Sequence, residues 1–100
     1  MDIYYFKDQL MDELEGAKMY IKNALEIRPM NQQWSKTLLE MSVEELKHAM
    51  NIFKMAEEYY KIMKESYKDV PKYIKDTYDS IVECYTEECS SIKVMQEMYK

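Results

Sequence analysis

Residues 41–55, MSVEELKHAMNIFKM, decide the fold because they belong to a long helical pattern. One face of that helix continues in both directions from Glu45 and His48 in alternating steps of three and four residues. Its members are Trp34, Leu38, Met41, Glu45, His48, Ile52, Met55, Tyr59, Ile62 and Ser66. A 3.5-residue period held over several heptads is typical of a helix that packs along other helices. The stretch therefore predicts a long helix with Glu45 and His48 on its packed face.

Composition extends this prediction to the whole chain. The 100 residues suit one domain, and a single Gly and two Pro leave few interruptions to helix. Pro29 and Pro71 mark the two breaks, because the residue before a proline is disfavoured in the α conformation. The sequence predicts an all-α fold of three antiparallel helices, at about residues 3–28, 32–67 and 71–99, with 1–100 as a single domain.

Charge and cysteine spacing exclude several classes of function. The net charge of −5 is spread along the chain, which argues against a nucleic-acid surface. We expect no signal peptide, because the first residues carry acids and lack a basic region followed by an apolar run. We expect no membrane span, because no segment has about 20 apolar residues. Cys84 and Cys89 lie about 140° apart around a helix, so we expect two reduced thiols and a cytoplasmic protein.

The other two helices carry similar apolar faces, each with one carboxylate. The first face is Ile3, Phe6, Leu10, Glu13, Ala17, Tyr20, Ala24 and Ile27, and the third is Ile74, Tyr78, Ile81, Tyr85, Glu88, Ile92, Met95 and Tyr99. A short link after Pro29 makes the first two helices antiparallel, and counting residues from it brings Glu13, Glu45 and His48 to one level. Glu88 falls near the same level.

These four residues predict a metal site in the interior. Glu45 and His48 lie about one turn apart on one helix face, so both side chains can reach one ion. Burying carboxylates costs several kcal/mol unless a cation neutralises them. Three carboxylates and one imidazole suit iron or manganese, and zinc less well. The alternative is that the pattern is slightly out of phase and these groups lie at solvated positions beside the core.

The motifs DELEG (residues 12–16) and EELKHA (residues 44–49) resemble half of a ferritin-like di-metal protein, such as rubrerythrin or the encapsulated ferritins. In that superfamily two helices each give a Glu and two others each give a Glu-x-x-His. The resemblance implies that Glu13 is a terminal ligand, Glu45 a bridging ligand and His48 the imidazole ligand, with Glu88 matching the Glu of the third helix.

The chain departs from that pattern because it has no fourth helix and His48 is its only histidine. A homodimer or larger homo-oligomer would supply the missing ligands, two ions per site being implied. Glu88 would then be surplus, or would line an access route with Asp12, Glu15 and Glu44. Tyr20, two turns from Glu13, could bond to a ligand or quench a radical, although a packing role is favoured.

The resemblance implies an iron protein that oxidises ferrous iron with oxygen or peroxide. Manganese or zinc are the other metals that the ligands allow. Two alternatives stay open: a non-catalytic helical interaction or scaffold module whose buried polar layer fixes register, and a ferritin-like bundle that has lost its chemistry.

Overall fold

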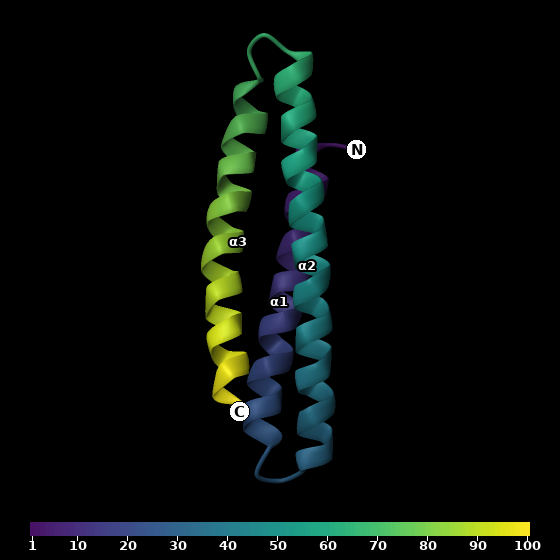
Figure 1. The fold of residues 1–100 in the computed structure, drawn as a ribbon, viewed down its shortest axis with the longest axis vertical. Coiled ribbons are helices and arrows are strands. Elements are labelled where there is room, and N and C mark those ends of the chain that lie inside the picture. Colours follow the sequence, from purple (N-terminus) through teal and green to yellow (C-terminus); the bar gives the residue numbers. More distant parts are fainter.

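The computed structural model describes residues 1–100 and consists of three helices without strands. Helix α1 spans Ile3–Ile27, α2 spans Gln32–Ser66 and α3 spans Lys72–Met98. Each end lies within one residue of its predicted position. The all-α prediction and the antiparallel order of the helices are confirmed (Figure 1). None of the three helices is apolar enough over a sufficient length to cross a membrane.

Local capping explains where the second and third helices begin. The side chain of Asn31 accepts a hydrogen bond from the backbone N–H of Trp34 at 3.0 Å, which satisfies one free donor at the start of α2. At the start of α3, the carbonyl of Pro71 accepts hydrogen bonds from the backbone N–H groups of Ile74 and Lys75. The links comprise only residues 28–31 and 67–71. Because links this short cannot cross the length of a helix, neighbouring helices run antiparallel.

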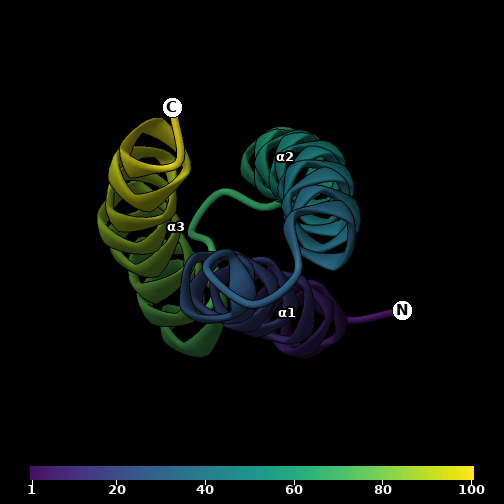
Figure 2. The same ribbon diagram turned by 90° about the horizontal axis from the view of Figure 1, so that it is seen from below.

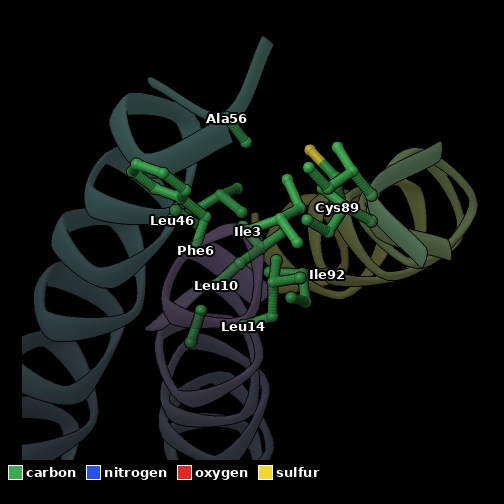
Figure 3. Packing of buried hydrophobic residues seen from close by; sticks show 12 residues of the cluster. Ile3, Phe6, Leu10, Leu14, Leu46, Ala56, Cys89 and Ile92 are labelled. Carbon is green, nitrogen blue, oxygen red and sulfur yellow. The ribbon is translucent and has the colours of Figure 1, made fainter. Parts of the chain in front are cut away.

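Helix α1 packs against both other helices, more extensively than these two pack against each other. Seen along the bundle, α2 and α3 lie on different sides of α1 (Figure 2). The molecule is long and narrow, 57 × 20 × 16 Å, and only 17 of its 100 residues are buried. The interior is therefore one thin column. Phe6, Leu10, Leu14, Leu46 and Ile92 meet within it (Figure 3).

Small residues form the contact between α1 and α2. Four fully buried residues of α2 recur every seven positions: Ser35, Ser42, Ala49 and Ala56. The two serines among them face the buried alanines Ala24 and Ala17 of α1. The Ser42 hydroxyl donates to the Ala17 carbonyl at 2.7 Å, and the Ser35 hydroxyl donates to the Ala24 carbonyl at 2.5 Å. Short side chains allow the two helices to approach closely, and the hydroxyl groups hold their register.

The predicted phase of α2 is therefore wrong by about one residue. None of the ten residues of its predicted packed face is fully buried, whereas Ser35, Ser42, Leu46, Ala49 and Ala56 are. On α1, Leu14 and Ile21 are buried, while Glu13, Tyr20 and Ile27 are half-buried. The error arises because large apolar side chains dominate a hydrophobic pattern, while close helix contacts use serine and alanine.

Aromatic stacking joins α2 to α3 in the half of the bundle near their link. The rings of Phe53 and Tyr85 stack with centroids 4.1 Å apart, and those of Tyr60 and Tyr78 stack at 4.2 Å. Burial raises the pKa of Tyr85 to about 12, with a further contribution from neighbouring Cys89. Tyr78 and Tyr85 thus have the packing role that the sequence predicts, and Cys84 and Cys89 are free thiols.

Candidate metal centre

Glu13 of α1 meets Glu45 and His48 of α2 beside the small-residue contact. One ligand atom from each of these three side chains lies within 4.8 Å of the other two. This confirms the prediction that the hairpin brings them to one level. Ser42 lies one turn before Glu45 and is bonded to α1, so the backbones that carry the two glutamates are held close together.

Gly16, the only glycine of the chain, provides the space for the Glu45 carboxylate. A Cβ atom at Gly16 would lie 3.2 Å from Oε2 of Glu45, closer than ordinary van der Waals contact. Gly16 is in the middle of α1, where glycine is less favourable than alanine by about 1 kcal/mol. The role of Gly16 was missed from sequence, although a lone glycine inside a strongly helical segment is a signal of close approach.

His48 presents different ring nitrogens to different carboxylates. Its Nδ1 lies 3.5 Å from Oε2 of Glu13 and 3.9 Å from Oε1 of Glu45, whereas its Nε2 lies 4.0 Å from Oε2 of Glu44. These distances exceed those of good hydrogen bonds. The Nδ1 atom therefore belongs with the two glutamates of the cluster, and Nε2 points toward the exposed Glu44.

The Glu13 carboxylate is incompletely satisfied. Its Oε2 atom is buried and accepts no hydrogen bond. An unsatisfied buried acceptor costs about 1–3 kcal/mol, and more when the group is charged. Either a proton or a cation between the side chains would remove that cost.

The pKa of Glu45 is raised above its ordinary value for a related reason. A protonated Glu45 can share its proton with Glu13, and this is the largest cause of the shift. Partial burial and the negative charge of Glu13 act in the same direction, while His48 opposes them. The two carboxylates thus repel each other as ions and favour the uptake of positive charge.

The cluster lies on the flank of the bundle, so the predicted interior position is wrong. The side chains of Glu13 and Glu45 are 24% and 28% exposed, and that of His48 is 51% exposed. The alternative of a slightly shifted helix phase is therefore correct in part. The three groups remain together and are partly shielded, and solvent or a ligand can reach them.

Glu88 does not join these three residues. It accepts a hydrogen bond from the Lys18 ammonium at 3.3 Å, forming an ion pair between α3 and α1. Glu88 lies on the predicted packed face of α3, but its charge is balanced there by the Lys18 ammonium of α1 rather than by a metal ion. The prediction that Glu88 is a fourth ligand is not supported by this arrangement.

The other predicted residues of the site lie in different places. Glu44 is exposed beside His48, and Tyr20 shares a shallow surface depression with Glu44 and Glu45. Asp12 is exposed. Glu15 lies beside Lys18 and Glu88, in a depression on the side of α1 that faces α3. Of these four residues, Glu44 and Tyr20 border the cluster.

No protein-family model matches this chain, and comparisons with curated proteins and with solved structures found no match either.

Proposed function

We propose that Glu13, Glu45 and His48 bind a transition-metal ion, with iron as the favoured metal. The observation that carries this proposal is the buried Oε2 atom of Glu13, which accepts no hydrogen bond and lies 3.5 Å from Nδ1 of His48. Two carboxylates and one imidazole, gathered around an oxygen atom that accepts no hydrogen bond, fit a divalent cation. Two carboxylates and one imidazole favour iron or manganese, with zinc as a further possibility.

The ligand set also supports a site with open coordination positions. Three protein ligands are fewer than the six that octahedral iron or manganese takes, so water or an oxidant can bind as well. Bound iron would supply one-electron redox chemistry. We propose that the protein is a ferroxidase, whose substrate is ferrous iron and whose oxidant is oxygen or peroxide.

The chain's own side chains would have separate roles at this site. Glu13 and Glu45 would stabilise the higher charge of ferric iron. At pH values where the raised pKa of Glu45 keeps its carboxyl protonated, metal binding would displace that proton. His48 would bind through Nδ1, because that atom faces the two glutamates. Glu44 would then orient the ring through Nε2, as carboxylates beside metal-bound histidines commonly do.

A second copy of the chain would complete the site. His48 is the only histidine, and the cluster lies on an accessible flank rather than in the core. Two copies of Glu13, Glu45 and His48 would give four carboxylates and two imidazoles for two ions. This arrangement agrees with a ferritin-like relationship, which we propose on the motifs and the site. The free thiols Cys84 and Cys89 support a cytoplasmic location as part of the same proposal.

Metal titration tests this function. Anaerobic protein is titrated with Fe(II), and with Co(II) as a spectroscopic probe, and bound metal is counted after gel filtration. We expect about one ion per chain, with strong losses in Glu45→Ala and His48→Ala. Glu88→Gln is the matched control, because Glu88 pairs with Lys18 outside the cluster. Equal binding by the wild type and the two cluster variants would contradict the proposal.

Oxidation is measured separately on the iron-loaded protein. Formation of ferric iron after addition of oxygen or peroxide should be faster than in buffer, and it should slow in Glu13→Gln. Metal binding without oxidation of the bound iron would instead favour the alternative of a ferritin-like bundle that has lost its chemistry.

A second candidate function is a non-catalytic helical interaction module. The exposed apolar residues of α2, including Trp34, Met41 and Met55, favour it. Under that interpretation, the polar cluster fixes helix register rather than binding metal. The protein would then contain no transition metal, and Glu45→Ala and His48→Ala would gain helix stability.

A further inference from the structure

Gln96 of α3 reaches the contact between α1 and α2 that carries the metal cluster. Its side-chain amide donates a hydrogen bond to the Ser42 hydroxyl at 3.1 Å, and that hydroxyl donates to the Ala17 carbonyl at 2.7 Å. The bond from Gln96 is the only side-chain hydrogen bond between α2 and α3. One residue of each helix thus takes part in a single hydrogen-bond relay, with the fully buried Ser42 at its centre.

The relay lies about one helical turn from both glutamates of the cluster. Ser42 precedes Glu45 by three residues on α2, and Ala17 follows Glu13 by four residues on α1. The bond from hydroxyl to carbonyl sets the distance between these two helices next to the point where their carboxylates converge. A change in the relay should therefore move Glu45 relative to Glu13.

The hydroxyl of Ser42 has an alternative acceptor. A helical serine or threonine can donate to the carbonyl four residues earlier in its own helix. Three exposed hydroxyl groups of this protein do so: those of Thr37, Ser66 and Thr86. A hydroxyl has one proton to donate. Because the Gln96 amide donates to the Ser42 oxygen from α3, the hydroxyl proton points the other way, to the Ala17 carbonyl of α1.

We propose that Gln96 is a positioning residue of the metal site. Its bond to Ser42 keeps that hydroxyl on the Ala17 carbonyl. The spacing of α1 and α2 at this level then holds Glu45 at the distance from Glu13 that one shared ion requires. This proposal rests on the proposed function, since it concerns the geometry of the same site. Helix α3 contributes no ligand, but through Gln96 it takes part in metal binding.

Two substitutions of Gln96 separate loss of its bond from reversal of the relay. Methionine has a side chain of similar length without a donor, so Gln96→Met leaves the Ser42 hydroxyl free to rotate. A carboxylate only accepts hydrogen bonds, so in Gln96→Glu the Ser42 hydroxyl would donate to α3 and leave the Ala17 carbonyl. The added negative charge by itself would attract a cation. A fall in metal affinity in Gln96→Glu would therefore report the reversed bond.

Titration of the full chain with Co(II), followed by visible absorption, tests the proposal. We expect the affinity to fall about threefold to tenfold in Gln96→Met and further in Gln96→Glu. This range lies at or below the lower end for partners of metal ligands, because Gln96 acts through Ser42. The Co(II) spectrum at saturation should also shift in both variants, because it reports how the ligands are arranged.

Ser35→Ala is the matched control. It removes an equivalent bond between the same two helices, from the Ser35 hydroxyl to the Ala24 carbonyl, ten residues before Glu45. This variant should lose stability but keep the wild-type Co(II) spectrum. Circular dichroism and thermal unfolding confirm that each variant is folded.

A double-mutant cycle shows whether Gln96 acts through the Ser42 hydroxyl. In a Ser42→Ala background the amide has no acceptor there, so Gln96→Met should change the Co(II) affinity by less than about twofold. An equal effect of Gln96→Met in both backgrounds would overturn the proposal, because Gln96 would then act by another route.

The outcomes separate this proposal from the proposed function. Wild-type protein that binds no Co(II) refutes the proposed function, and the role of Gln96 with it. Wild-type binding that Gln96→Met leaves unchanged, in both affinity and spectrum, overturns only the role of Gln96.

Discussion

Gly16→Ala should stabilise the metal-free protein and weaken metal binding. The substitution adds one methyl group inside α1, and its Cβ would lie 3.2 Å from Oε2 of Glu45. Alanine is favoured over glycine in a helix interior by about 0.8–1.0 kcal/mol. The atom in the way is the end of a flexible side chain, so Glu45 can move aside by about a few tenths of an ångström when it holds no metal.

The two effects have different sizes. A gain of about 1 kcal/mol raises the Tm of a domain this small by about 4–8 °C. In the metal-bound protein, the same displacement moves a ligand and should lower the affinity about tenfold, in line with changes to groups that position metal ligands. The added methyl group therefore raises the Tm in EDTA but reduces the further rise that metal produces.

Thermal unfolding with EDTA and with Co(II), followed by circular dichroism, measures both effects. Ser91→Ala, at an exposed position of α3, is a control that changes helix propensity without touching Glu45. In a Glu45→Ala background, Gly16→Ala should keep its stabilising effect and have no effect on metal binding. Unchanged metal affinity in the single variant would refute the assignment of Glu45 as a ligand. A lower Tm in EDTA would refute the argument that its side chain can move.

Three further predictions follow from the same contacts. In metal-free protein, the pKa of Glu45 is raised from 4.5, so the folded state holds a proton on Glu45 at pH values where the unfolded chain has lost it. The free energy of unfolding should therefore fall as pH rises through this range. Urea titrations at several pH values measure this trend, and Glu45→Gln should flatten it. Over the same pH range, metal affinity should instead increase with pH, because binding displaces that proton; calorimetry in that range, in buffers of different ionisation enthalpy, would count it, and no proton release there would contradict this. Ser42→Ala should lower the free energy of unfolding by about 1–3 kcal/mol, because it leaves the Gln96 amide without its acceptor and the Ala17 carbonyl without the hydroxyl donor; a change below about 0.5 kcal/mol would contradict it.

The helices were predictable from sequence because their signals are local. Pro29 and Pro71 mark the breaks, Asn31 caps α2, and apolar spacing covers the rest. The level of Glu13 with Glu45 and His48 was also predictable, because a short link fixes the register of an antiparallel hairpin. Counting residues is sufficient for positions along the helix axis.

Rotation around the axis was not predictable in the same way. Helix α2 has two faces with a heptad repeat, and the stronger apolar pattern belongs to the less buried one. The face that packs on α1 contains Ser35 and Ser42, which a search for apolar residues ignores. The pairing of Glu88 with Lys18 was missed because the identity of a residue in a pattern does not reveal its partner on another helix.

The central claim is that Glu13, Glu45 and His48 bind one metal ion together. Crystals soaked with Fe(II) without oxygen, and measured at the iron absorption edge, test it most directly. The account predicts an anomalous peak in contact with all three side chains, with Nδ1 as the histidine ligand. Crystals that show no peak there, with the three side chains turned apart into solvent, would contradict it.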